Sequence, residues 1–364
     1  MISRDLRLDS LRGILLVIMT FNHLRGDISQ LTSEPFGFVS AAEGFVLLSA
    51  YTAAITWKRD VIPFTSMLSV GFRRAWKIYK YHAVLLLFFG FVALASHTYA
   101  QYWEEMFFTT DASLLHTVSA GLVLVHQPMF CDILPMYVIF SLATPFLLRA
   151  LQSGYIHSLL LASAVVWLFG QWVHPIPDMK MAFEWDVRTG LFNLLSWQLL
   201  WVVGLVIGFM HAHQGINLSI RHPGMIATAF GLVLVCFLFR HEIFALPTSI
   251  LPHFQKPTIG VLRLLNVCAQ LILALYILTA LPRNLNLPWF SNLGRYSLQV
   301  FTYHVFIIYL TFPAAWRFSQ MGSVAEIAFH VSIVASLTIP VWLYGQYGKY
   351  VPRSLSLPKS NRGN

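Results

Sequence analysis

The sequence predicts an all-α protein that crosses a membrane many times. Hydrophobic residues make up 57% of its 364 residues and charged residues only 11%, and its mean hydropathy is +0.65. A soluble chain of this length cannot bury so much apolar side chain. We attribute the net charge of +9 to Lys and Arg residues that anchor cytoplasmic loops, and not to binding of nucleic acid.

Ten apolar stretches are long enough to be membrane spans. They cover residues 10–26, 36–57, 79–99, 131–150, 156–173, 190–211, 224–241, 259–281, 295–313 and 324–346. A shorter apolar stretch at 113–126 predicts an interfacial helix; if it crosses the membrane instead, the spans number eleven and the C-terminus changes side. We expect one integral-membrane domain over residues 1–346 and a basic cytoplasmic tail over 347–364.

The basic residues orient these spans. With the N-terminus in the cytoplasm, the inner loops hold most of the 24 Lys and Arg residues, which satisfies the positive-inside rule. The outer loops then collect acidic residues, namely Glu104, Glu105, Asp111, Asp178, Glu184 and Asp186. With ten spans, both termini are expected in the cytoplasm.

The first span carries two ionisable residues on one face. Arg12 and His23 are separated by about three helical turns, or about 16 Å along the helix axis. Ionisable side chains inside a membrane helix are costly and usually mark a function. Arg12 could instead extend to the lipid headgroups and His23 could be a solvated helix end, but their shared face favours a functional pair.

The second span contains a carboxylate, Glu43, among small residues that allow close helix packing. The connection between the first two spans is short, so Glu43 and His23 are expected at similar depth on neighbouring helices. We predict that Glu43 positions His23. The alternative is a structural ion pair that takes no part in chemistry.

Residues 58–80 form a basic and aromatic segment, predicted as a cytoplasmic loop, that includes the sequence FRRAWKIYKY. Such a segment is typical of a membrane-surface helix that binds anionic lipids. We also predict that Arg73, Arg74 and Lys77, together with Arg12, hold the phosphates of an anionic cytosolic donor.

Other polar groups lie within the later spans. Arg263, Asn266 and Gln270 form a stripe on the eighth span that should face the bundle interior. His304 in the ninth span is expected to be a hydrogen-bonded interior residue. Arg295, at the inner end of that span, is a weaker candidate for binding the donor.

No metal site is expected. The cysteines are widely spaced, at Cys131, Cys236 and Cys268. Three histidines are close in sequence, at His211, His213 and His222, but no nearby acidic residue or cysteine supports a metal site there.

A histidine beside a buried carboxylate is a general-base arrangement, and an arginine can hold an anionic donor or a developing negative charge. This set suits acyl transfer to a hydroxyl. The same residues could relay protons in a polytopic transporter or glycan exporter without acyl-transfer activity. In a third interpretation, a scaffold for glycan synthesis, these polar residues would have no chemical role.

Five segments, in order, carry a recognisable pattern: RLDSLRGILLVIMTFNH, FGFVSAAEGFVLLSAY, HQPMFCDILPMYVIFSLATPF, FNLLSWQLLWVVGLVIG and GRYSLQVF. Together they resemble the OpgC-type family of membrane proteins, which succinylate osmoregulated periplasmic glucans and belong to the acyltransferase-3 superfamily. The resemblance covers roughly residues 4–310. The Arg-x10-His pattern of the superfamily falls on Arg12 and His23.

The resemblance implies an acyltransferase of the bacterial inner membrane with His23 as its catalytic residue. It also implies a cytosolic acyl-CoA donor, for which succinyl-CoA is the candidate, and a sugar hydroxyl of a periplasmic glucan or other polysaccharide as acceptor. Two positions depart from the family pattern: Asn22 stands where an acidic residue often precedes the histidine, and residues 48–50 read Leu-Ser-Ala where Leu-Ser-Gly is usual. These departures leave the acyl group and the acceptor open, and the oligomeric state is open as well.

Overall fold

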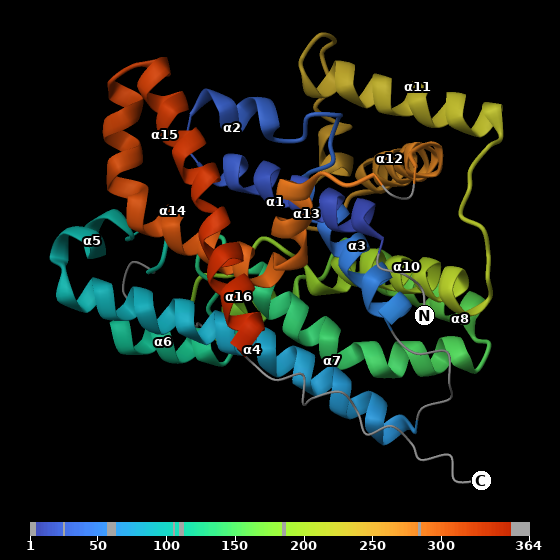
Figure 1. Ribbon diagram of the computed structural model, residues 1–364, viewed down its shortest axis with the longest axis horizontal. Helices are drawn as coiled ribbons and strands as arrows, with labels where there is room; N and C mark the ends of the chain where they lie inside the picture. The colour runs from blue at the N-terminus through green and yellow to red at the C-terminus, as the bar shows by residue number, and fades with distance from the viewer. Residues whose placement is uncertain are drawn as a thin grey trace.

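The computed structural model describes residues 5–24, 26–56, 63–104, 106–108, 113–183, 187–282 and 285–350 (Figure 1). Within these ranges every regular element is helical. The helices are α1 (Leu6–His23), α2 (Asp27–Thr32), α3 (Ala41–Thr56), α4 (Phe64–Ala95), α5 (His97–Tyr102), α6 (Leu114–Leu122), α7 (Ile133–Gln152), α8 (Ile156–Phe169), α9 (Pro175–Phe183), α10 (Leu194–His213), α11 (Pro223–Arg240), the 3₁₀ helix η1 (Leu251–Phe254), α12 (Val261–Ala280), α13 (Pro288–Arg295), α14 (Ser297–Gln320), α15 (Ser323–Ser336) and α16 (Thr338–Tyr350).

Each of the ten predicted spans overlaps a helix, although residue 25 of the first span and residue 57 of the second lie outside the described residues. In the described part of the chain, 7 helical segments are long and apolar enough to cross a membrane: α4, α7, α10, α11, α12, α14 and the α15–α16 segment over residues 323–346. Two shorter apolar helices, α3 and α8, and the charged helix α1 account for the remaining three predicted spans. The protein is an all-α polytopic membrane protein, as the sequence predicts.

Helix α4 corrects the expected loop at residues 58–80. It is one continuous helix of 32 residues, about 48 Å long, so the basic segment from Phe64 onward is its first half. Residues 58–62 of the predicted loop lie outside the described residues. No proline interrupts α4, and its single early glycine, Gly71, is the point where Pro145 of α7 packs against it. Figure 1 shows α4 and α7 side by side.

Two other segments differ from expectation in detail. The predicted span at 324–346 is divided at Leu337, which lies between α15 and α16. The predicted interfacial helix at 113–126 is α6, which has 9 residues and is about 14 Å long. Since a bilayer core is about 30 Å thick, α6 is too short to be an eleventh span.

Helix α13 packs closely against the first half of α1. Gly13 of α1 faces the carbonyl oxygen of Phe290, and Gly294 of α13 faces the carbonyl oxygen of Asp9, so a Cβ atom at either glycine would collide with backbone. Small residues permit this close approach of two helices within a membrane. The crossing holds α1, which carries Arg12 and His23, against the rest of the bundle.

A second close packing joins α3 to α10. Gly204 faces Leu47 and Ala50, and Gly208 faces Tyr51 and Ala54 one turn further along α3. The contact buries most of one side of α3. It thereby fixes the position of the helix that carries Glu43.

Candidate functional site

Two histidines, from helices that are far apart in the sequence, form the centre of the candidate site. His23 is the last residue of α1, and its Nδ1 atom lies 3.0 Å from the Nε2 atom of His304 in α14. The two rings are stacked with centroids 5.1 Å apart. Phe130 stacks on His23 at 4.1 Å. His304 is fully buried, whereas His23 is half-buried.

The contact between the rings constrains the tautomer of His23. One of the two facing nitrogens must carry the hydrogen. If Nδ1 of His23 donates to Nε2 of His304, the Nε2 atom of His23 keeps a free lone pair and can accept a proton from a substrate. A neutral imidazole in His304 can thus orient His23 as a carboxylate orients the histidine of a catalytic triad. The expectation that His304 is a hydrogen-bonded interior residue is confirmed.

The hydrogen-bond partners of Glu43 are Ser40 and Arg263 and not His23, so the prediction that Glu43 positions His23 gains no support from these contacts. The carboxylate of Glu43 is fully buried and accepts hydrogen bonds from the backbone amide and hydroxyl of Ser40 and, at 2.6 Å, from Nε of Arg263. The Arg263 guanidinium is itself buried. It therefore requires a counter-charge inside the bundle, and the Glu43 carboxylate supplies it. Glu43 therefore joins α3 to α12.

The polar stripe of α12 faces the bundle interior, as predicted. Arg263 and Asn266 are buried. Arg263 also binds Glu34 at 2.6 Å. Asn266 accepts a hydrogen bond from the backbone amide of Phe38, and Gln270 donates to the backbone of the same loop. The stripe thus holds the connection between α2 and α3 in place.

A second polar cluster lies toward the other end of α1. The guanidinium of Arg12 donates a hydrogen bond to the Thr52 hydroxyl of α3 at 2.6 Å. Arg74 of α4 lies over the ring of Trp201, 5.7 Å from its centroid, and is close enough to Arg12 for their charges to interact. The hydroxyl of Tyr137 is close enough to Arg12 and Arg74 to interact with both of their charges. Two cations within range of each other give this region a positive potential that attracts an anion.

The other predicted donor-binding residues are not part of this cluster. Arg73 and Lys77 are exposed on a different face of α4, and Arg73 donates to the hydroxyl of Ser69. Arg295 is also exposed and lies over the ring of Tyr296. Residues at consecutive positions in a helix point about 100° apart, which explains why Arg74 turns inward while its neighbour Arg73 turns outward.

Lys256 was not singled out by its sequence context, yet its charge reaches the site. It is half-buried, and its ammonium group acts electrostatically on His23, Glu43 and Asp132. The loop that carries it is fixed through its carbonyl groups, because the indole of Trp197 donates to the carbonyl oxygens of residues 256 and 257. A solitary lysine in a polar loop gives no sequence signal for such a position.

The loops that precede α7 and α10 are also held by polar side chains. His126 is fully buried; its Nε2 donates to the carbonyl oxygen of Phe107 and its Nδ1 accepts from the amide of Arg188. Asp132 accepts from the amide of Leu191. In the part of the chain that the structure describes, no group of three or more His, Cys, Asp or Glu side chains is placed to hold a metal ion.

Comparison with known families agrees with this architecture. The chain matches the family described as OpgC protein over residues 4–349. No significant match to a curated protein or to a solved structure was found. Because the family match extends over nearly the whole sequence, from before α1 to the end of α16, the chain belongs to the OpgC family.

Proposed function

We propose that the protein is a membrane acyltransferase that moves an acyl group from cytosolic acyl-CoA to hydroxyls of a periplasmic glucan. Membership of the OpgC family supports a glucan succinyltransferase type of function, with succinyl-CoA as the candidate donor. The observation that carries the proposal is the presence of two different polar sites on α1: a histidine pair at one end and an arginine pair about 16 Å away.

The two sites suit the two substrates. The Arg12–Arg74 pair would bind the phosphates of the donor, because guanidinium groups bind phosphate oxygens in a bidentate manner. The charge pattern of the loops supports an orientation in which this end of α1 faces the cytoplasm and the histidine end faces the periplasm of a bacterial inner membrane, with both termini in the cytoplasm. An extended donor bound at the arginines would then direct its thioester toward His23.

The proposed reaction uses His23 as a general base. Its Nε2 atom takes the proton of a sugar hydroxyl while the hydroxyl oxygen bonds to the thioester carbonyl carbon. The carbon–sulfur bond then breaks, and the leaving thiolate of coenzyme A takes up the proton. His304 keeps the His23 ring in the required orientation and tautomer. In the alternative route His23 carries the acyl group transiently before the sugar receives it.

Mass spectrometry of periplasmic glucans tests the proposal directly. We would compare cells that lack the protein, cells that contain it, and cells with His23→Ala. As a matched control, His157→Ala replaces a histidine that is exposed on α8. A fixed mass increment that requires the protein and His23, but not His157, is the expected result, and its size identifies the acyl group. Unmodified glucans in every strain would contradict the proposal and favour a transporter or exporter.

A further inference from the structure

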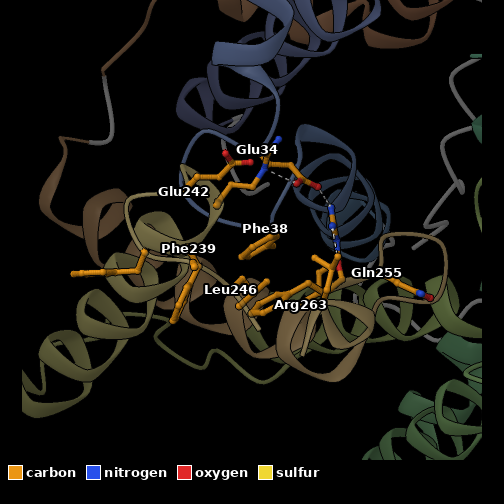
Figure 2. A pocket seen from close by; sticks show the side chains of 12 residues that line it. Glu34, Phe38, Phe239, Glu242, Leu246, Gln255 and Arg263 are labelled. Atoms are coloured by element: carbon orange, nitrogen blue, oxygen red, sulfur yellow. Dashed lines mark hydrogen bonds and ion pairs between the residues drawn. The ribbon is translucent and has the colours of Figure 1, made fainter. Parts of the chain in front are cut away.

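A cavity of about 740 Å³ lies beside the Glu34–Arg263 ion pair (Figure 2). It is formed by the loop before α3, the end of α11 with the loop that follows, η1, and the start of α12. Its volume is within the range of small-molecule sites, which is about 300–1,000 Å³. Neither the histidine pair nor the arginine pair lines it, so the proposed reaction leaves its role unassigned.

One side of the cavity is charged, and its charged side chains bind one another. The carboxylate of Glu34 accepts from Arg263 at 2.6 Å and from Arg240 at 3.1 Å. Glu242 also lines the cavity, and Figure 2 shows it on the same side as Glu34. Glu43 also binds Arg263, so three carboxylates accompany two guanidinium groups here. This wall has no excess of positive charge, and it is suited to neutral polar groups and not to a polyphosphate.

The facing side is aromatic. Phe38 and Phe254 are stacked with ring centroids 3.9 Å apart, and Phe239 and Leu246 continue this surface. Figure 2 shows Phe239 and Leu246 across the cavity from the labelled glutamates. The cavity therefore offers hydrogen-bonding groups on one side and flat apolar rings on the other.

The backbone at the two glutamates is in an uncommon conformation. Glu34 and Glu242 have φ angles of 58° and 57°, in the left-handed region that residues other than glycine seldom adopt. Such a conformation is costly and persists where the surrounding structure enforces it, most often at ligand sites. Here it occurs at both acidic residues that line the cavity.

We propose that this cavity binds a hexosyl unit of the acceptor glucan. A hexose ring has hydroxyl groups that match the carboxylates and guanidinium groups, and an apolar face of C–H groups that matches the phenyl rings. Glu34 and Phe38 lie between α2 and α3, in the stretch of chain that connects α1 to α3. This stretch therefore joins the cavity wall to the end of α1 where transfer is proposed. The assignment rests on the proposed function, because that function supplies a glucan as the acceptor.

Direct binding of a linear glucose tetrasaccharide to the purified full-length protein in detergent tests this assignment. Glu242→Gln removes a charge without a change of shape, and Phe239→Ala removes a ring from the apolar wall. We expect each variant to raise the Kd at least about tenfold. The matched controls are Glu104→Gln, at an exposed outer position, and Phe230→Ala, an exposed phenylalanine of α11; both should stay within about twofold of the unmodified protein.

Several results would overturn the assignment. They are failure of the unmodified protein to bind the tetrasaccharide, an equal loss of affinity in the controls, and displacement of the sugar by coenzyme A. Should Phe239→Ala fail to fold, Glu242→Gln alone decides the outcome, since Gln has almost the same shape as Glu.

The test separates this inference from the proposed reaction. His23→Ala should retain tetrasaccharide binding while it abolishes acylation. Binding at the cavity without any acylation in the unmodified protein would contradict the proposed reaction and leave the sugar site standing. Acylation with an unchanged KM for the glucan in both cavity variants would contradict the sugar site and leave the reaction standing.

Discussion

His23 and His304 lie 281 positions apart in the chain, yet their ring nitrogens are 3.0 Å apart. The contact joins the end of α1 to the first half of α14. When Nδ1 of His23 is the donor, Nε2 of His23 keeps a free lone pair for chemistry. His304 is fully buried and is therefore assigned the role of a positioning residue.

Replacement of His304 tests this role. We expect His304→Ala to lower the kcat of acyl transfer by about a hundredfold or more, because His23 loses the group that fixes its tautomer. The KM for acyl-CoA should stay nearly constant. His304→Gln should retain more activity, since its amide oxygen can accept from Nδ1 of His23.

Steady-state kinetics on purified protein measures both values. The double variant His23→Ala/His304→Ala should be no slower than His23→Ala alone, because residues that act as one unit are not additive. If the two losses instead multiply, His304 acts independently of His23.

The contact of Glu43 with Arg263 predicts a structural effect. Removal of one partner leaves the other charge buried, so Arg263→Met should reduce the free energy of unfolding by about 3–5 kcal/mol. Arg263 also binds Glu34, and Glu34 in turn binds Arg240. Because the Arg240 side chain is 32% exposed, Arg240→Met should reduce the free energy of unfolding by about 1 kcal/mol or less. Thermal unfolding in detergent compares the two variants.

Glu43→Gln separates the structural role from a catalytic one. We expect it to lower the Tm, with a loss of transfer that follows the loss of folded protein. An unchanged Tm combined with a complete loss of transfer would contradict this and restore Glu43 as a catalytic residue, as the sequence had predicted.

The position of Arg74 near Arg12 predicts that the basic residues of α4 contribute unequally to binding of the donor. Arg12→Ala and Arg74→Ala should each raise the KM for acyl-CoA about tenfold or more, because a charge-assisted hydrogen bond to phosphate is lost. Arg73→Ala is the matched control, since Arg73 is one position from Arg74 but exposed. An equal effect of Arg73→Ala would indicate that the surface of α4, and not the half-buried Arg12 and Arg74, binds the donor.

The fold could be predicted from the sequence because apolar stretches of bilayer length identify themselves locally. The site was predictable only along α1, where helical periodicity places Arg12 and His23 on one face. The partner of His23 was not predictable, because no local pattern records a contact between helices so distant in sequence. The same limit applies to Glu43. The short connection between the first two spans predicted that it lies at the depth of His23, whereas the partner of its carboxylate is Arg263, which is distant in sequence. Lys256 was missed because its position depends on hydrogen bonds to its backbone, which are independent of its side chain.

The glycine contacts between α1 and α13 yield a last prediction. Gly13→Ala and Gly294→Ala should each destabilise the protein by about 1–3 kcal/mol, because the added methyl group meets backbone carbonyl oxygens that cannot rotate away. Both should also reduce acyl transfer, since a shift of α1 moves Arg12 and His23 together. Gly231→Ala in α11 is the control: nothing lies within 4 Å of its added Cβ, and alanine favours helix over glycine by about 1 kcal/mol. Thermal unfolding and transfer assays compare the three variants. Equal stability and equal transfer activity in all three would contradict the expected role of this crossing.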